Sequence, residues 1–422
     1  MTKIFHDAIA SQLCRIALAT LCAFLLVACE PDVATTPEDT ATAEMDERLV
    51  FATSLFTNVD QTDRFNQLAE VFPANKMTAS PEPWTFDEGE PIALPETFAY
   101  HDAEITTSDF LDLTDTSALL VIKDGRVIYE NYWLTGGPDV QWMSFSVGKS
   151  FVSALVGIAL QEGLFESVEE QLVDYVPELA GSAYDGARIK DVLQMSSGAR
   201  WNEDYSDPAS DVNRYIRTFG DGSSLDEFTA TLVREHEPGT VNYYNSSDTQ
   251  AIGMFLTRIT GKSLAEYAEE KLWHPLGMEH NAYWVADNHG VELAAGGLQV
   301  AARDYAKYGQ LYLNNGSWNG QQIVSEQWVR ESLEMDGPHL QPGASDPDYP
   351  VGYGYQWWIL DGDEDEFSAI GVYNQFIYIA PRNNLVIVKL SAFQQYGSSL
   401  DPAVYQELES IELFRAIGSV AP

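Results

Sequence analysis

Two pairs of short apolar runs, each pair interrupted by a polar turn, lie far apart in the chain. In the first pair, apolar residues 118–122 and 127–129 flank a turn that contains Asp124-Gly125. Asp-Gly is a strong signal for a tight turn between strands. In the second pair, residues 376–380 and 385–390 flank Pro381-Arg382-Asn383-Asn384. Because β-branched and aromatic residues dominate these runs, we expect two β-hairpins.

Helical spacing of apolar residues is typical of the chain between the two hairpins. The stretch Phe151–Leu160 is continuously apolar or small, and residues 300–313 and 325–335 fit helix patterns. Loops rich in Gly, Pro, Asp and Asn break the remaining segments. A closing helix is expected at about 402–417.

These patterns together predict an α+β fold. We expect an antiparallel β-sheet flanked by helices, with sheet-forming parts at about 95–145 and 350–415. A mainly helical lobe is expected to be inserted at about 165–345. Residues 49–100, which contain Trp84 and several Pro, are expected to wrap this domain as irregular structure and short helices.

The N-terminus has the pattern of a targeting segment. Positive charges are followed by an apolar run that ends in Leu26-Val27-Ala28-Cys29, which resembles a bacterial lipobox. We therefore expect residues 1–28 to be a lipoprotein signal peptide and Cys29 to be lipidated. Residues 29–48 are acidic and are expected to form a flexible tether. The remaining residues, 49–422, are expected to form the catalytic domain.

The composition of the chain restricts the compartment in which it can work and the partners that it can bind. The chain has 422 residues, a net charge of −41 and three cysteines, all of which lie at or before Cys29. Cysteine nucleophiles and cysteine-ligated zinc are therefore excluded in the domain, and so is a disulfide. The negative charge would repel nucleic acid and anionic membrane surfaces. We expect an exported protein on the periplasmic face of the outer membrane, or alternatively a soluble periplasmic one, that contacts the membrane only through its lipid anchor.

Ser146-Val147-Gly148-Lys149 carries the candidate chemistry. Ser146 and Lys149 are three residues apart at the start of the predicted apolar helix, so they share one of its faces. Free backbone N–H groups at a helix N-terminus can stabilise developing negative charge. A hydroxyl beside an amine at this place suits acyl transfer through a serine ester. The tetrapeptide alone is also compatible with an ordinary helix cap and a solvated lysine.

Three further segments favour the catalytic interpretation of Ser146 and Lys149 over an ordinary helix cap. They are Glu203-Asp204-Tyr205-Ser206-Asp207-Pro208, Tyr244-Asn245-Ser246 with Gly253 nine residues after the tyrosine, and Gly371-Val372-Tyr373-Asn374-Gln375. In this order and spacing, residues 95–415 resemble the serine β-lactamase and penicillin-binding-protein superfamily, in its class C and esterase branch. They are most similar there to 6-aminohexanoate-dimer hydrolases and related esterases. The resemblance implies a β-lactamase/transpeptidase-like fold.

The resemblance assigns roles to individual residues. It makes Ser146 the nucleophile, Lys149 its base and Tyr244 a second proton carrier between nucleophile, leaving group and water. It makes the backbone amides of Ser146 and Val372 the oxyanion hole, beside Gly371. A lysine can act as a base only when its pKa falls, which the apolar stretch after Lys149 makes plausible.

Substrate contacts are also implied. Tyr205 would contact the scissile amide, and Glu203 or Asp207 would favour cationic groups. Ser246 stands where class C enzymes usually carry Asn, so that Asn245 or Ser247 could take over its role. No cofactor is required, and the histidines show no metal-ligand spacing.

One departure from the superfamily pattern bears on the substrate. Ala369-Ile370-Gly371 stands where β-lactamases of this superfamily carry Lys-Thr-Gly, whose cation helps to hold a substrate carboxylate. We therefore expect a serine hydrolase that cleaves a small ester or amide through an acyl-enzyme on Ser146. The alternatives are a β-lactamase or D-alanyl-D-alanine carboxypeptidase, and a binding protein that uses the same fold without catalysis. The sequence leaves the oligomeric state open.

Overall fold

The computed structural model describes residues 47–362, 364–398 and 405–421. The signal peptide predicted at 1–28, Cys29 and nearly all of the tether predicted at 29–48 lie outside these residues, so those expectations stay predictions. No helix in the described ranges is long and apolar enough to cross a bilayer.

An eight-stranded sheet contains both predicted hairpins. The first hairpin is β5 (Thr116–Lys123) and β6 (Arg126–Tyr132), and the second is β15 (Gln375–Ala380) and β16 (Leu385–Ser391). The strand order is β12-β13-β14-β15-β16-β5-β6-β2, so that β16 and β5 join the two hairpins although they are far apart in sequence. All pairs are antiparallel except β2 with β6. The remaining strands are β2 (Asp87–Glu88), β12 (Val351–Tyr353), β13 (Trp358–Leu360) and β14 (Phe367–Gly371).

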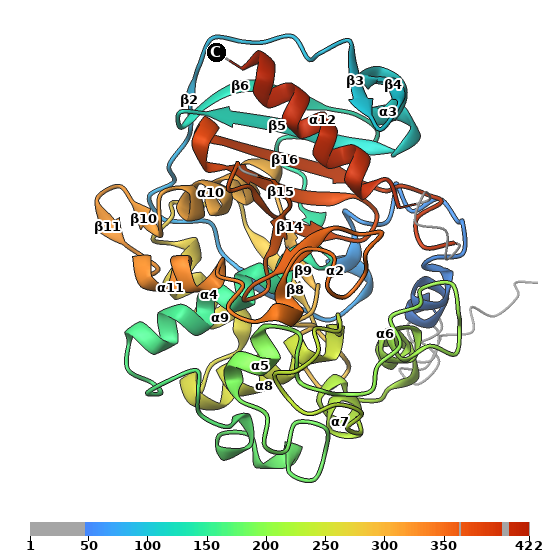
Figure 1. The fold of residues 1–422 in the computed structure, drawn as a ribbon, viewed down its shortest axis with the longest axis vertical. Coiled ribbons are helices and arrows are strands. Elements are labelled where there is room, and N and C mark those ends of the chain that lie inside the picture. The colour runs from blue at the N-terminus through green and yellow to red at the C-terminus, as the bar shows by residue number, and fades with distance from the viewer. Residues whose placement is uncertain (1–46, 363, 399–404, 422) are drawn as a thin grey trace, which may run out of the picture. The chain divides into compact units, whose positions relative to one another are not determined.

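Helices cover both faces of this sheet (Figure 1). Successive residues of a strand point to opposite faces, so β15 and β16 pack on both sides. On one face, Phe414 of α12 (Glu407–Val420) contacts the rings of Phe376 and Tyr378. On the other face, α10 (Ala302–Leu313) approaches so closely that a Cβ at Gly309 would lie 2.6 Å from Val386. The expected antiparallel sheet flanked by helices is confirmed.

A second, four-stranded sheet was not expected. Its order is β1-β8-β9-β7, with β1 (Ala74–Met77), β8 (Ala282–Val285), β9 (Leu298–Val300) and β7 (Trp142–Met143). It shows that residues 49–100 do more than wrap the domain, because β1 pairs with a strand more than 200 residues later. Its strand β7 ends three residues before Ser146, which ties the candidate nucleophile to this sheet.

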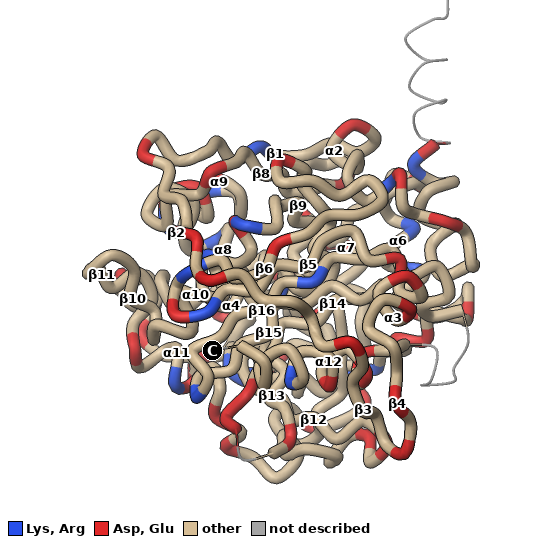
Figure 2. The backbone as a smooth tube through the Cα atoms, turned by 90° about the horizontal axis from the view of Figure 1, so that it is seen from above, with Lys and Arg blue, Asp and Glu red and all other residues tan. Residues whose placement is uncertain are grey.

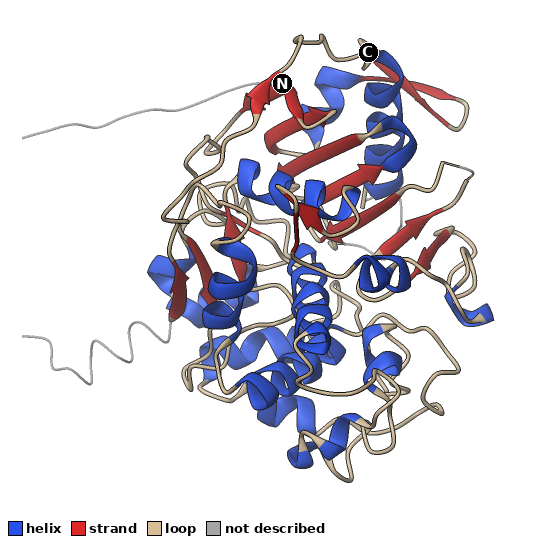
Figure 3. Ribbon diagram, turned by 90° about the vertical axis from the view of Figure 1, so that its left-hand side faces the viewer, coloured by secondary structure: helices blue, strands red, loops and turns tan. Residues whose placement is uncertain are grey.

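The region between about 165 and 345 is mainly helical, as expected, although it also holds β8, β9 and the small hairpin β10–β11 (Ser317–Trp318 and Gln321–Gln322). Figure 3 shows most helices gathered apart from the large sheet. The helices of this region are α5 (Ile189–Leu193), α6 (Asp211–Asp221), α7 (Leu225–Ala230), α8 (Ser246–Thr260), α9 (Leu264–Ala268), α10 and α11 (Glu326–Ser332).

The long apolar helix predicted after Ser146 is α4 (Val147–Gln161). Nearly all of its residues are buried on every side, which is why its sequence lacks a polar face. The helix α11 packs so closely against α4 that only glycine fits at position 157. A Cβ at Gly157 would lie 2.4 Å from the Trp328 ring of α11. The helix thus forms a rigid base for the residues at its N-terminus.

The N-terminal part of the described chain also contains α2 (Leu68–Val71), the hairpin β3–β4 (Thr97–Tyr100 and Ala103–Thr106) and α3 (Thr107–Leu113). Before α2, residues 47–54 form a helical segment. Along the whole backbone, Asp and Glu outnumber Lys and Arg and are spread over many loops (Figure 2).

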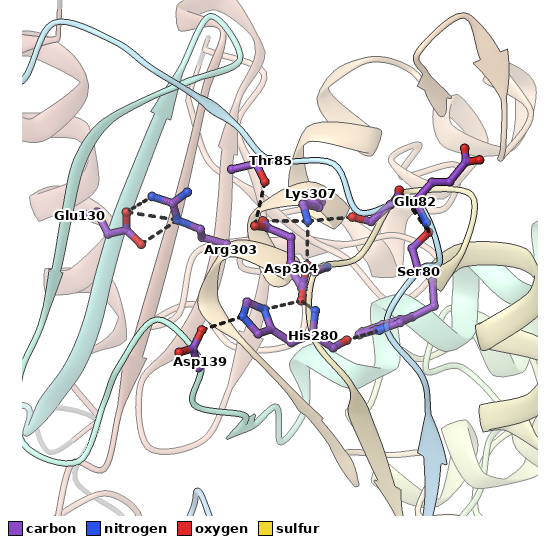
Figure 4. A network of polar contacts seen from close by, with 12 residues as sticks. Ser80, Glu82, Thr85, Glu130, Asp139, His280, Arg303, Asp304 and Lys307 are labelled. Carbon is purple, nitrogen blue, oxygen red and sulfur yellow. Dashed lines mark hydrogen bonds and ion pairs between the residues drawn. The ribbon is translucent and has the colours of Figure 1, made fainter.

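Buried charges tie α10 to the loop before β8 (Figure 4). The Asp304 carboxylate accepts hydrogen bonds from the backbone N–H groups of Glu279 and His280, from the His280 ring and from the Lys307 ammonium. Lys307 is fully buried and also donates to the Gly277 carbonyl at 3.0 Å. These contacts satisfy every charge of the cluster within the fold, so we assign it a structural role.

Candidate active site

Ser146 lies at the N-terminus of α4 with its side chain partly exposed. Phe145 before it adopts a left-handed backbone conformation with a φ of 44°, which is unusual for a bulky residue. Two glycines make room for this turn. A Cβ at Gly296 would lie 2.9 Å from the Phe145 carbonyl carbon, and a Cβ at Gly371 would lie 3.1 Å from the Ser146 nitrogen. The strained turn therefore holds Ser146 against both sheets.

Lys149 is buried one helical turn after Ser146. Its ammonium donates hydrogen bonds to Ser146 Oγ at 2.9 Å, to Ser246 Oγ at 3.2 Å and to the Ala295 carbonyl at 2.8 Å. Burial lowers the pKa of Lys149 to about 8, whereas the charge of Glu203 acts in the opposite direction. Roughly a tenth of the amine is therefore neutral at pH 7, and this form can accept a proton from the serine hydroxyl.

Tyr244 lies in the loop before α8, and its ring centroid is 5.2 Å from Lys149 Nζ. The ring stacks on Trp358, which fixes its plane. Burial raises the pKa of the Tyr244 phenol well above its ordinary value, while a hydrogen bond with Ser146 opposes that rise. The phenol is therefore protonated at neutral pH and lies beside Lys149. The structure brings these three side chains together.

Ser246 is hydrogen-bonded to the group formed by Ser146, Lys149 and Tyr244. Its hydroxyl accepts from Lys149 and donates to Glu203 Oε1 at 2.7 Å. Asn245 instead caps α8 by accepting from the Ser247 N–H, and Ser247 shares a hydrogen bond with Thr229. Of the three residues that sequence reasoning left open, Ser246 is the one whose side chain contacts Lys149.

A buried carboxyl group holds the start of α8 in place. Asp248 accepts hydrogen bonds from Tyr184, Ser197 and Asn245 at 2.7–3.0 Å. Burial raises the pKa of Asp248 to about 7. The Ser196-Ser197-Gly198 loop therefore supports the segment that carries Tyr244.

Glu203 and Tyr205 line a cavity beside Ser146, but Asp207 does not. The Glu203 carboxylate accepts from the Ser246 N–H, from the hydroxyls of Ser246 and Tyr205, and from the indole N–H of Trp201. Asp207 accepts from the N–H of Ala209 within its own loop. The expected cationic subsite at Asp207 is therefore not part of the arrangement around Ser146.

Backbone donors for an oxyanion are present at the same place. Within the described residues, the Ser146 N–H has no hydrogen-bond acceptor. Val372 follows Gly371 at the end of β14 and lines the cavity beside Ser146. Both expected donors are thus close together, although the pairing of Val372 N–H with an oxyanion stays a prediction.

The contacts of Glu203 give a testable pH effect. Glu203→Gln removes the negative charge that raises the pKa of Lys149, so the pKa of Lys149 should fall further. If neutral Lys149 is the base, kcat/KM rises with pH through the pKa of Lys149, and in the variant this rise should move to lower pH. We expect the activity at pH 7, relative to the high-pH plateau, to increase roughly threefold. The measurement is a pH profile of kcat/KM between pH 5.5 and 9.5.

Glu237→Gln is the matched control for this profile, because Glu237 is exposed and lies outside the site. Its profile should superimpose on that of the parent. A shift to higher pH in Glu203→Gln would contradict the role of Lys149 as the base.

Sequence reasoning missed much of the cavity wall. Six of the residues that line it belong to the N-terminal part of the described chain: Phe51, Ala52, Leu55, Phe56, Leu68 and Phe72. The only available signal was that aromatic and aliphatic residues recur in this segment. In the described ranges, no group of three or more His, Cys, Asp or Glu side chains is arranged to hold a metal ion.

Comparison with known proteins gives one family match. Residues 114–409 match the family model described as Beta-lactamase. The chain is 34% identical over 292 residues to the 6-aminohexanoate-dimer hydrolase of Paenarthrobacter ureafaciens, an alignment that covers 67% of this chain and 74% of the relative.

Solved structures share the fold. One described as "Putative 6-aminohexanoate-dimer hydrolase from Bacillus anthracis" superimposes with a TM-score of 0.74 at 23% identity, over 86% of this chain and 96% of that chain. A family VIII carboxylesterase superimposes with a TM-score of 0.55 at 15% identity, over 79% of this chain and 99% of that chain.

Proposed function

Since the chain belongs to the Beta-lactamase family and is a serine hydrolase, we propose that it cleaves a small ester or amide through an acyl-enzyme on Ser146. The observation that carries this proposal is the hydrogen bond from buried Lys149 to Ser146 Oγ. A nucleophile and its base within hydrogen-bond reach are the parts that covalent catalysis requires. Tyr244, whose ring centroid lies 5.2 Å from Lys149 Nζ, supplies a second proton carrier beside this pair.

The acylation step follows from these positions. Lys149 takes the proton of Ser146 as Oγ attacks the substrate carbonyl carbon, which gives a tetrahedral oxyanion. The backbone N–H groups of Ser146 and Val372 stabilise this oxyanion. Tyr244 donates its proton to the leaving oxygen or nitrogen as the bond to the acyl carbon breaks. The proton on Lys149 then returns to the phenolate of Tyr244.

Deacylation reverses the same path. Neutral Lys149 takes the proton of Tyr244, and the resulting phenolate removes a proton from a water molecule, whose oxygen attacks the ester carbonyl of the acyl-enzyme. The bond to Ser146 Oγ breaks, the serine recovers its proton and the acid is released. The raised pKa of Tyr244 suits this role, since a phenol that holds its proton at neutral pH is a strong base once it has given it up.

Mapping of a covalent adduct tests this proposal. The protein is treated with a fluorophosphonate probe and digested, and the modified peptide is sequenced by mass spectrometry. We expect a single adduct, on Ser146, that forms as fast as hydrolysis of p-nitrophenyl butyrate is lost.

The control is heat-denatured protein, which should not be labelled. An adduct on another serine, with ester hydrolysis lost in step, would refute Ser146 as the nucleophile. The same preparation is assayed with nitrocefin. We expect little turnover, because Ala369 provides no cation for a substrate carboxylate; rapid turnover would favour the β-lactamase alternative.

A further inference from the structure

The cavity beside Ser146 is almost entirely apolar. About 690 Å³ of space is free of atoms there, part of it open to solvent. Polar side chains occur where the cavity meets the catalytic group: Ser146, Lys149, Glu203, Tyr205 and Ser246. Elsewhere the lining is aliphatic or aromatic, apart from the hydroxyl of Tyr215, which donates to Gln250.

One wall comes from the N-terminal segment, defined here as residues 49–72. This wall is held by specific contacts with the domain. The Phe56 N–H donates to the Tyr373 hydroxyl at 2.8 Å, and a Cβ at Gly220 would lie 2.5 Å from Leu49 Cα. The segment precedes the family match, which begins at residue 114. The wall is therefore a feature of this chain outside the part that the family model describes.

The aromatic side chains that line the cavity form two groups. Phe56 stacks on Tyr205, whose hydroxyl is bonded to Glu203 near the catalytic group. Phe72 contacts both Phe51 and Phe219. Within the described residues, this second group makes no ring contact with Tyr205 or Phe56.

No charge is available to bind a charged substrate group inside the cavity. Among the described residues that line it, only Lys149 and Glu203 carry a basic or acidic side chain. Lys149 already donates three hydrogen bonds. Glu203 already accepts from Ser246, Tyr205 and Trp201. Burial of an ammonium or carboxylate in the remaining apolar part would lack a partner and would be strongly unfavourable.

The position of Tyr244 decides which half of the substrate enters. Tyr244 does not line the cavity, and its ring stacks on Trp358 instead. In the proposed mechanism Tyr244 protonates the leaving group, so the leaving group lies on the side of Tyr244. The cavity is then left for the acyl group.

We infer that the apolar cavity, with the N-terminal segment as one wall, selects substrates whose acyl group is an uncharged hydrocarbon chain or ring. This inference rests on the proposed function, because it names the substrate class of that site. It separates this chain from a hydrolase whose substrate carries an ammonium at the end of its acyl group.

Three p-nitrophenyl esters test the inference in the unmodified protein. Acetate has almost no acyl chain, hexanoate has an apolar one, and 6-aminohexanoate has the length of hexanoate with a terminal ammonium. We expect kcat/KM for hexanoate to exceed that for acetate by about tenfold or more, because four further carbon atoms leave water. We expect kcat/KM for 6-aminohexanoate to be at least roughly tenfold below that for hexanoate.

A variant pair locates the effect in the wall. Ala52→Leu places a larger side chain on the cavity side of the helical segment 47–54, and Thr53→Leu makes a similar addition at the adjacent exposed position. The hexanoate-to-acetate ratio of kcat/KM should fall by about tenfold in Ala52→Leu and stay unchanged in Thr53→Leu. Fluorophosphonate labelling and thermal unfolding of both variants report whether the site and the fold persist.

The outcomes are distinguishable. Equal kcat/KM values for acetate and hexanoate, or a preference for 6-aminohexanoate, would overturn the inference about the acyl group. If that hydrolysis still required Ser146, the proposed function would stand. Hydrolysis that does not require Ser146 would overturn both. If Ala52→Leu fails to fold, the three esters with the unmodified protein still decide the question.

Discussion

Replacement of Ser146 by alanine is expected to lower kcat for ester hydrolysis by roughly 10⁴-fold or more and to abolish fluorophosphonate labelling. Oγ is the atom that forms the proposed acyl-enzyme, and buried Lys149 donates a hydrogen bond to it at 2.9 Å. The backbone oxyanion donors and the cavity remain, so the variant should still bind substrate. The measurements are single-turnover hydrolysis of p-nitrophenyl hexanoate and gel detection of the labelled protein.

Ser419→Ala provides the control, because Ser419 is exposed near the end of α12 and does not line the cavity. It should keep full activity and labelling. The thermal unfolding of Ser146→Ala should match that of the parent, since Ser146 is partly exposed. Hydrolysis at the parental rate in Ser146→Ala would refute the proposed mechanism.

Replacement of Lys149 by methionine should lower kcat/KM by roughly 10³-fold or more, because Ser146 loses the base that takes its proton. In the parent, kcat/KM should rise as pH increases through the pKa of Lys149, which burial lowers to about 8. This rise should be absent from the residual activity of the variant. Pre-steady-state release of p-nitrophenol measures the acylation step directly.

Lys149→Arg distinguishes proton transfer from charge. Arginine keeps a positive charge beside Ser146, yet it does not lose its proton at any pH of the assay. It should therefore be about as inactive as Lys149→Met. Lys76→Met, at an exposed position of β1, should behave like the parent. Restored activity in Lys149→Arg would show that Lys149 acts through its charge.

The large sheet could be predicted from sequence because its signals are local. Asp124-Gly125 and the apolar runs around it specify a hairpin within 17 residues, and β5 and β6 confirm it. The four-stranded sheet could not be predicted in this way. Its strand β1 has the sequence Ala-Asn-Lys-Met, without a clear alternation, and its partner β8 is more than 200 residues away. Pairing there depends on tertiary packing, which a local pattern does not contain.

In the site, too, local spacing could be predicted from sequence and most long-range contacts could not. The spacing of Ser146 and Lys149 placed both on one helix face, and their hydrogen bond agrees with that placement. The nearness of Tyr244 came from the family resemblance, since nearly 100 residues separate it from the helix. The partner of Lys149 at the Ala295 carbonyl could not be predicted, because a backbone acceptor leaves no signature in side-chain identity. Asp207, the alternative to Glu203 as a contact for cationic groups, does not line the cavity, because its carboxylate accepts from the Ala209 N–H within its own loop.

The residues proposed for catalysis and the residues inferred to select the acyl group lie in different parts of the polypeptide. The residues proposed to break the bond lie within the part of the chain that matches the family model, whereas the six wall residues inferred to face the acyl group precede it by 42 to 63 positions. If the inferred acyl site is correct, substitutions in residues 51–72 should change which acyl groups are accepted and leave the proposed catalytic residues in place. A protein trimmed to the family boundary would lose this wall together with strand β1 of the four-stranded sheet, so the wall and the support of Ser146 share one stretch of chain.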